Sequence, residues 1–433
     1  MLKGAGVAAG QGARSGQEPG RSPAGGGFDP TVDTARLLRR VGFFVLVFLL
    51  PIGAVVSRRA SVILTPVAVA LLALASLIDR APRSPATFLR NVFGSAGGVA
   101  ALVLVGWAVL SIAWTQFPAT AAEKVLQIGW MTFIGLAGVA AMPERVRTAN
   151  LHLIPVGVAI GALGAIALGA FRAQDVNAEL MDADPLDRGL VVLAVMVWPA
   201  VAWLACRGRV LGACVLLAVV AVATCVMPEN AALLAVAVGA GLYALVRLTG
   251  DRGVRLAAIV MPALLAFAPL FPLVPRPFLK FFHGPMYPGA VALRAWAEET
   301  GREPLRMLTG HGLDTSIRSR LAGFLSPDAP RTLPFEIWYE LGVVGALSAA
   351  AALYFAIMTA RRQENPSLAA GIVACFGAAF AIASFGDANA QSWWLATLAA
   401  AIITFMAIRR GAFRAARPLA IGPLRRPPPR AGG

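Results

Sequence analysis

Charged side chains are scarce in this sequence. Asp, Glu, Lys and Arg make up 14% of the 433 residues, whereas apolar residues make up 58%. The mean hydropathy is correspondingly high, at +0.72. A soluble domain of this size needs a wetted exterior, which such a composition does not supply. The shortage of charge therefore excludes an ordinary soluble globular protein and indicates an integral membrane protein.

The apolar runs themselves contain no Asp, Glu, Lys or Arg. About 12 such runs occur, nine between Val41 and Val274 and three between Val343 and Ile408, and with a flanking turn each reaches the roughly 20 residues of a spanning helix. Lipid offers no partner to an unpaired backbone amide, so each run is predicted to be helical. We therefore expect an all-α polytopic membrane protein with about 12 transmembrane helices. The missing charge argues against an ion-coupled pump, which usually keeps an ionisable group near the midplane.

One long polar stretch interrupts the apolar runs and divides the predicted helices into two groups. Residues 1–40 form a basic N-terminal segment, 41–274 hold helices one to nine, and 275–342 form a large loop. Residues 343–408 hold helices ten to twelve, and 409–433 form a basic tail. Both ends have a composition typical of disorder. The first 35 residues are too polar for the apolar region of a cleavable signal peptide.

Acidic residues are the minority charge, with 22 Asp and Glu against 38 Lys and Arg and a formal net charge of +16. In a polytopic protein this excess is distributed by topology and does not indicate nucleic-acid binding. A cytoplasmic N-terminus leaves most Lys and Arg on the cytoplasmic side, and only the turn with Arg58 and Arg59 clearly disagrees. We expect both termini in the cytoplasm and the large loop outside.

Cysteine, histidine and several catalytic motifs are also rare or missing. The four cysteines lie in or beside apolar runs without metal-ligand spacing, as expected of core residues; they are Cys206, Cys214, Cys225 and Cys375. No phosphate-binding loop, His-Glu-x-x-His or Gly-x-Ser-x-Gly motif occurs. Asp182-Ala183-Asp184 has the spacing of a metal-binding pair, but this spacing is common in acidic loops. The sequence predicts no metal and no cofactor.

The large loop contains two helical patterns and many arginines. Leu293, Trp296 and Ala297 share one face of a helix that Pro304 and Gly310 end, and a second pattern runs from Leu333 into helix ten. The loop has one lysine, Lys280, against Arg276, Arg294, Arg302, Arg306, Arg318, Arg320 and Arg331. Guanidinium groups bind phosphate bidentately, which suits a lipid diphosphate at the membrane surface. Arginines that merely snorkel around a wet loop are the alternative.

Four motifs resemble the O-antigen ligase and O-antigen polymerase superfamily of bacterial inner-membrane glycosyltransferases. Leu110-Ser111-Ile112-Ala113-Trp114-Thr115 is similar to the family's Leu-Ser-x-x-Trp-Ser, and Asp187-Arg188-Gly189 to its Asn-Arg-Gly. Arg294-x-Trp296 and the turn at Gly310-His311-Gly312 resemble its Arg-x-x-x-Trp region and Gly-aromatic-Gly turn. Glu340-Leu341-Gly342-Val343-Val344-Gly345 is similar to its Glu-Leu-Gly-x-x-Gly. The resemblance extends over most of the chain.

This resemblance implies a metal-independent, inverting glycosyl transfer at the outer face of a bacterial inner membrane. The donor would be a glycan on undecaprenyl diphosphate, and the acceptor a hydroxyl of another glycan or of lipid A-core. Arg188 and Arg294 match the family's diphosphate-binding arginines and would stabilise charge on the leaving group. The other candidate substrate-binding residues are His311, Arg318, Arg320 and Glu340.

The chain departs from the family at the general base. Family ligases carry His-Pro-His-Asn before the Glu-Leu-Gly helix, and ungapped counting places this motif on Ala329-Pro330-Arg331-Thr332. An arginine does not accept a proton at neutral pH, so we expect Arg331, the third candidate catalytic residue, to bind phosphate or glycan. A working transferase would then need another base or none, and the carboxylates available near the loop as a base are Asp314, Glu336 and Glu340.

Three functions stay open at the level of sequence. The chain is a glycan transferase or polymerase, a catalytically silent scaffold of a polysaccharide assembly complex, or a transporter or flippase of a lipid-linked glycan. Loss of the base favours the scaffold. The long loop follows helix nine and no internal repeat is visible, whereas a carrier of two halves would centre its loop after helix six.

Overall fold

The computed structural model describes residues 30–79, 85–143, 151–172, 185–225, 231–273, 288–386 and 391–411. Every regular element in these ranges is a helix, which confirms the predicted all-α class. Some predictions lie outside the described residues. These concern most of both terminal segments, the pair Asp182 and Asp184, and the start of the large loop with Arg276 and Lys280.

The first half of the chain forms the following helices. They are α1 (Pro30–Phe44), η1 (Val45–Leu49), α2 (Leu50–Val56), α3 (Ala60–Ile78), α4 (Pro85–Phe93), α5 (Ala96–Leu110), η2 (Ser111–Ala113), α6 (Pro118–Ala141), α7 (Leu153–Arg172) and α8 (Pro185–Cys206). The second half continues with α9 (Val210–Thr224), α10 (Ala231–Thr249), α11 (Asp251–Ala266), η5 (Ala268–Leu273), α13 (Pro288–Arg302), α14 (Arg306–Thr309), α15 (Thr315–Leu321), α16 (Leu333–Met358), η6 (Thr359–Arg362), α17 (Pro366–Phe385) and α18 (Ser392–Arg410).

Ten helices in the described ranges are long and apolar enough to cross a membrane. This supports a multi-pass membrane protein. Two other predicted runs form shorter helices, α9 with 15 residues and α11 with 16 residues. A total of about 12 spanning helices therefore stays a prediction.

The uncharged runs turn out to be only parts of the helices that they predict. Helix α6 begins at Pro118 and includes Glu123 and Lys124 before its apolar run. Helix α16 begins at Leu333, as its pattern predicted, and includes Glu336 and Glu340. The apolar runs are free of charge, as the sequence shows, but these two helices extend beyond them and carry ionisable side chains near their first turns.

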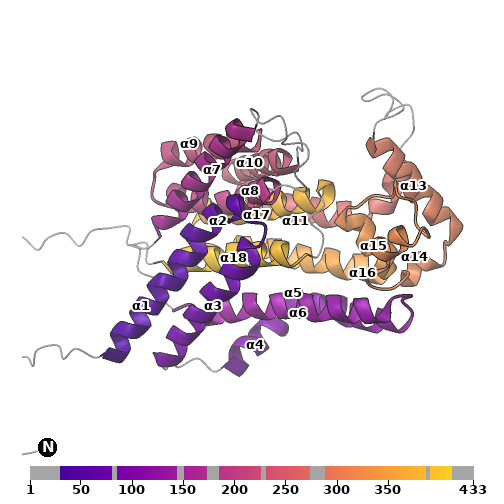
Figure 1. The fold of residues 1–433 in the computed structure, drawn as a ribbon, viewed down its shortest axis with the longest axis horizontal. Helices are drawn as coiled ribbons and strands as arrows, with labels where there is room; N and C mark the ends of the chain where they lie inside the picture. The colour runs from indigo at the N-terminus through magenta and orange to yellow at the C-terminus, as the bar shows by residue number, and fades with distance from the viewer. Residues whose placement is uncertain are drawn as a thin grey trace, which may run out of the picture.

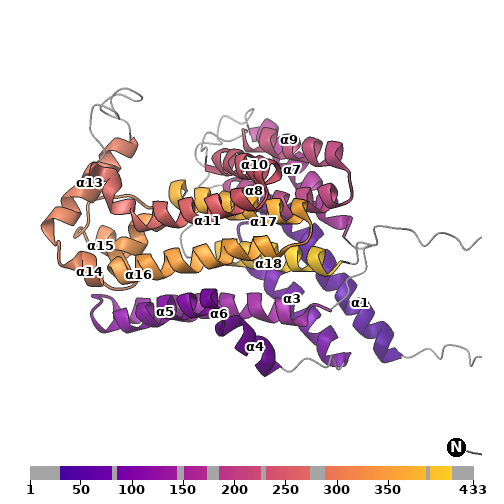
Figure 2. The ribbon, with the colours of Figure 1, turned by 180° about the vertical axis from the view of Figure 1, so that it is seen from behind.

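Helix α8 forms the centre of the bundle, with nearly all of its side chains from Leu190 to Leu204 buried. It packs against α2, α7, α9, α17 and α18, while α16 packs between α5 and α11. Figure 1 and Figure 2 show α13, α14 and α15 gathered at one end of the bundle. We call residues 288–332, which hold these three helices, the loop lobe.

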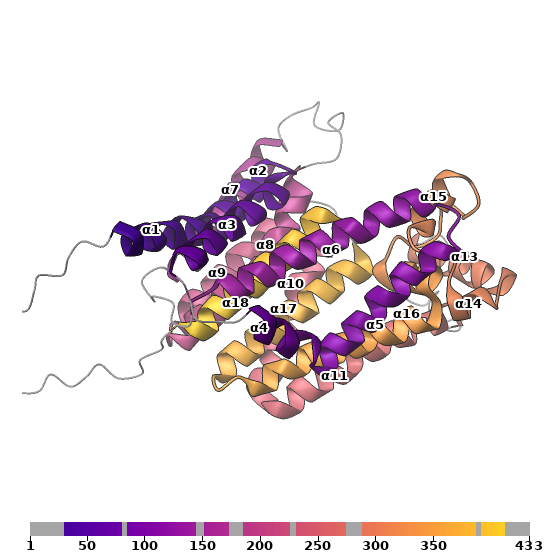
Figure 3. The ribbon, with the colours of Figure 1, turned by 90° about the horizontal axis from the view of Figure 1, so that it is seen from below.

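The loop lobe lies at the opposite end of the bundle from the start of α1 and the end of α18 (Figure 1). Figure 3 shows that the ends of α5 and α6 nearest one another in the chain also reach toward the loop lobe. Helix α1 therefore begins, and helix α18 ends, at the same end of the bundle, as expected if both termini lie on one side of the membrane. Which side is cytoplasmic stays a prediction.

Cysteine labelling tests this orientation. In a variant without native cysteines, Asp328→Cys in the exposed end of the loop lobe should react with a membrane-impermeant maleimide from outside. Glu364→Cys, exposed between α16 and α17 at the opposite end, is the matched control and should react only after the inner membrane is permeabilised. The reverse pattern would contradict the orientation.

Candidate functional site

The candidate site lies where the turn Gly310-His311-Gly312 meets α16. Helix α16 is kinked at Gly342, whose φ of 62° and ψ of −159° are not helical. The amides of His311 and Gly312 donate to the carbonyl oxygens of Tyr339 and Glu340, each at 2.9 Å. The turn therefore pairs with carbonyls beside the kink, where regular helical pairing is interrupted.

Glycine is required in this turn because the two backbones approach very closely. A Cβ on Gly310 would lie 2.1 Å from the carbonyl oxygen of Glu340, and one on Gly342 would lie 2.6 Å from that of Leu308. Both residues also have positive φ, at 75° and 62°, which glycine adopts without a steric penalty. The sequence pattern of glycines thus specifies a close contact between loop lobe and α16.

The end of α5 completes the contact. Trp107 donates from Nε1 to the carbonyl of Leu341 at 2.8 Å. Ser111 Oγ accepts from the amide of Leu313 at 3.1 Å, and Thr115 Oγ1 donates to the carbonyl of the same residue at 3.1 Å. Three segments far apart in the sequence, 107–115, 310–314 and 338–345, therefore meet at one place.

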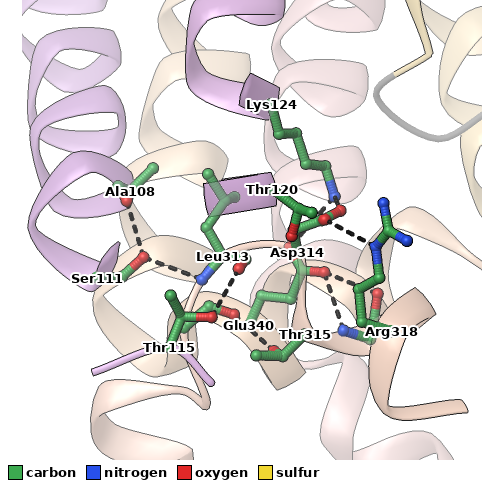
Figure 4. Close-up of polar contacts among 12 residues, drawn as sticks. Ala108, Ser111, Thr115, Thr120, Lys124, Leu313, Asp314, Thr315, Arg318 and Glu340 are labelled. Carbon is green, nitrogen blue, oxygen red and sulfur yellow. Dashed lines mark hydrogen bonds and ion pairs between the residues drawn. The ribbon is translucent and has the colours of Figure 1, made fainter. Parts of the chain in front are cut away.

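A buried ion cluster of Lys124, Asp314 and Glu340 lies beside this contact (Figure 4). Lys124 Nζ of α6 is 3.4 Å from Asp314 Oδ1 and 3.5 Å from Glu340 Oε2. Ser316 donates to Glu340 Oε1 from its amide at 3.2 Å and from its hydroxyl at 2.7 Å. Arg318 Nε lies 3.5 Å from the second Asp314 oxygen. The cluster joins α6, α15 and α16.

Burial makes this ion cluster energetically important. The side chains of Lys124 and Asp314 are each 12% exposed and that of Glu340 is 5% exposed. Removing one partner of a buried ion pair typically costs about 3–5 kcal/mol, because the remaining charge is left uncompensated. The cluster also holds Asp314 in the left-handed conformation, with φ of 64° and ψ of 14°, which L residues adopt at a cost of roughly 1–2 kcal/mol.

Four predicted substrate-binding residues lie in or next to this contact. His311 stacks on Tyr339 with ring centroids 4.1 Å apart. Arg318 is exposed beside Asp314, and Arg320 Nη2 donates to the carbonyls of Ala329 and Pro330, each at 3.1 Å. Glu340 is engaged inside the protein by Ser316 and Lys124. Direct contact of these four with substrate stays a prediction.

The three predicted catalytic arginines lie on separate elements. The guanidinium of Arg188, in the first turn of α8, is 5.4 Å from the ring centroid of Trp393 in α18. Arg294 is exposed on α13, and Arg331 is exposed just before α16. A diphosphate clamp formed by Arg188 and Arg294 stays a prediction.

Sequence reasoning missed Lys124 and Ser316, and it read Asp314 only as a possible proton acceptor. Lys124 lies outside the apolar run that defined its helix, and its partners are about 190 and 216 residues away in the sequence. One signal was present: Lys124 is one of only three lysines in a chain with 38 basic residues. A compact ammonium fits between two carboxylates without the width of a guanidinium fork.

No protein-family model matches the chain, and comparison with curated proteins finds none similar to it. In the described part of the chain, no group of three or more His, Cys, Asp or Glu side chains is placed to hold a metal ion. The candidate site is accordingly characterised by its own geometry: a glycine-dependent contact, a buried ion cluster and exposed arginines at the loop-lobe end of an apolar helical bundle.

Proposed function

We propose that the protein is a bacterial inner-membrane glycosyltransferase that transfers or polymerises a glycan from undecaprenyl diphosphate, in O-antigen or exopolysaccharide assembly. The observation that carries the proposal is the meeting of segments 107–115, 310–314 and 338–345. Two of the four motifs that resemble the O-antigen ligase and polymerase superfamily lie in these segments, together with the glycine turn of a third. Their meeting at one place is what supports the proposal.

Arginine supplies the proposed chemistry. Arg188 and Arg294 would bind the donor's diphosphate and stabilise the negative charge that grows on it as the glycosidic bond breaks. Arg188 lies against Trp393, which limits the orientations of its guanidinium. Arg294 is exposed on the loop lobe, free to reach a phosphate at headgroup level. Arg331 would bind phosphate or glycan at the start of α16.

Substitution of the arginines tests this proposal. In a strain that lacks the native gene, Arg188→Ala and Arg294→Ala should each reduce polysaccharide transfer about 100-fold or more, the size of effect seen when a charge-stabilising donor is removed. Arg362→Ala, exposed at the opposite end of the bundle, is the matched control and should retain full transfer. Equal transfer by all three variants, at equal protein levels in the membrane, would contradict the diphosphate site.

A transporter of a lipid-linked glycan is the second candidate, because an ionisable residue in a spanning helix is by default a functional candidate. Lys124 in α6 is such a residue. It lies six residues after Pro118, or about 9 Å along a 24-residue helix, and so near one end and not at the middle. Its partners come from the loop lobe and from α16 before its kink. This position favours a structural tie at the membrane surface over a midplane transport site.

A further inference from the structure

Helix α15 in the loop lobe has an inverted distribution of polarity. Thr315, Ser316 and Ser319 are buried against the protein. Ile317 and Leu321 lie four residues apart, and so on one face of the helix, and they are 40% and 77% exposed. A surface helix in water normally buries its apolar stripe and exposes its polar face. The opposite arrangement in α15 indicates that its outer face meets an apolar partner.

Hydrogen bonds account for the polar residues on the inner face. Thr315 Oγ1 donates to the carbonyl of Gly312 at 2.6 Å, and Ser316 Oγ donates to Glu340 Oε1 at 2.7 Å. Both hydroxyls would lose these partners if α15 turned its apolar residues inward, and a buried hydroxyl without a partner is costly. The contacts of the candidate site therefore hold α15 in its inverted orientation.

Phe324 continues the apolar surface beyond the end of α15. Its amide donates to the carbonyl of Ser319 at 2.8 Å, and the amide of Gly323 donates to that of Arg320 at 3.2 Å. These two hydrogen bonds, with Gly323 at a φ of 79°, form a Schellman motif, which ends many helices. Phe324 is 68% exposed in this ordered turn. We call Ile317, Leu321 and Phe324 the apolar face of α15.

The ion cluster gives the depth of α15 relative to the membrane. Lys124 is the last charged residue of α6, and Val125–Ala141 after it contains no Asp, Glu, Lys or Arg. Lys124 also lies about 9 Å inside the end of α6 that reaches the loop lobe, since it follows Pro118 by six residues. Asp314, which directly precedes α15, is 3.4 Å from Lys124 Nζ. Helix α15 therefore begins where the apolar part of α6 begins, at the level of the lipid headgroups.

Arg318 supplies a positive charge next to the apolar face. It follows Ile317 directly, it is exposed, and its Nε lies 3.5 Å from Asp314 Oδ2. A guanidinium has more N–H donors than this contact uses, so it can also donate to a phosphate. Apolar side chains beside a basic residue are typical of helices that lie in the headgroup region of a bilayer.

We infer that α15 lies in the membrane interface, with its apolar face inserted among phospholipid acyl chains and Arg318 at the headgroup phosphates. The partner of this face is the bilayer around α6, because that lipid surface extends to the level at which α15 begins. The inference does not depend on the proposed glycosyl transfer. It makes the loop lobe a part of the protein that is anchored in lipid, and it places the ion cluster at the edge of the bilayer.

Spin labels measure the depth of the apolar face. Full-length protein without native cysteines is reconstituted in vesicles of phosphatidylethanolamine and phosphatidylglycerol, with a nitroxide at Leu321→Cys. This label should collide several times more often with dissolved oxygen, which concentrates in lipid, than with a nickel chelate that stays in water. Asp328→Cys, exposed in the same lobe, is the matched control and should show the opposite preference.

A photocrosslinker tests the same face with all native cysteines present. In the same vesicles, Phe324→p-benzoylphenylalanine should on illumination form an adduct with the mass of a phospholipid, detected by mass spectrometry. The same replacement at Asp328 should form no such adduct. Phospholipid adducts at Phe324 and the preference for oxygen at Leu321→Cys would together support the interfacial helix.

Other outcomes would overturn the inference. A label at Leu321→Cys that meets the nickel chelate as often as the label at Asp328→Cys would place the apolar face in water. A label shielded from both reagents, or an adduct between Phe324→p-benzoylphenylalanine and a second protein chain, would show that protein covers the face instead of lipid. Glycan transfer enters neither measurement, so the interfacial helix can fail while the proposed function stands.

Discussion

Replacing Lys124 with methionine should lower the free energy of unfolding by about 3–5 kcal/mol. Two buried carboxylates, Asp314 and Glu340, would lose the cation that compensates them. Methionine keeps an unbranched side chain of similar length, so the loss measures charge more than packing. Thermal unfolding in detergent, followed by size-exclusion chromatography, should show a clearly lower midpoint than for wild type.

Two further variants isolate the buried charge as the cause. Glu123→Gln changes the exposed neighbour of Lys124 and should alter stability by less than about 0.5 kcal/mol. Adding Glu340→Gln to Lys124→Met removes one stranded carboxylate and should restore part of the lost stability. Equal midpoints for Lys124→Met and Glu123→Gln would show that the ion cluster does not hold the loop lobe to α6 and α16.

Replacing Gly310 with alanine should prevent the loop lobe from docking on α16. The new Cβ would lie 2.1 Å from the carbonyl oxygen of Glu340, a backbone atom that cannot move without breaking the contact. The Gly310 φ of 75° and ψ of 174° lie in a region essentially restricted to glycine, which adds roughly 1–3 kcal/mol of strain for alanine. We expect a loss of well over 3 kcal/mol and loss of transfer activity, measured by unfolding and by polysaccharide assay.

Gly323 separates the two causes of this loss. It also has a positive φ, at 79°, but a Cβ there meets no atom within 4 Å. Gly323→Ala should therefore cost only the roughly 1–2 kcal/mol of the backbone conformation. The close approach at Gly310 should make its loss clearly the larger of the two. Similar losses in both would mean that conformation alone accounts for the glycine requirement.

Helices were predictable from the sequence because lipid imposes one solution on every long apolar run. Hydrophobic periodicity correctly predicted helices in the large loop, where the patterns near Trp296 and Leu333 form α13 and the start of α16. Burial on α13 was predicted less well. Trp296 and Ala295 are buried but Ala297 is exposed, because the helix packs on η5 and Phe335 through a slightly rotated face.

The candidate site was predictable only in outline. The glycine turn and the residues around Glu340 could be singled out by pattern, but their contact is tertiary and has no local signal. Lys124 was missed because hydropathy marks the apolar part of a helix and ignores its charged ends. Its pairing with Asp314 and Glu340 depends on how α6 and the loop lobe are brought together, which no spacing within either segment encodes.

Transfer by purified protein is the most direct measurement of the proposed function. The full-length protein in nanodiscs would receive an oligosaccharide on undecaprenyl diphosphate together with a glycan acceptor. We expect one undecaprenyl diphosphate released for each glycan extended, with both products reduced about 100-fold or more in Arg188→Ala and unchanged in Arg362→Ala. Absence of both products in wild type, or equal product from wild type and Arg188→Ala, would contradict a transferase that uses the arginines of this site.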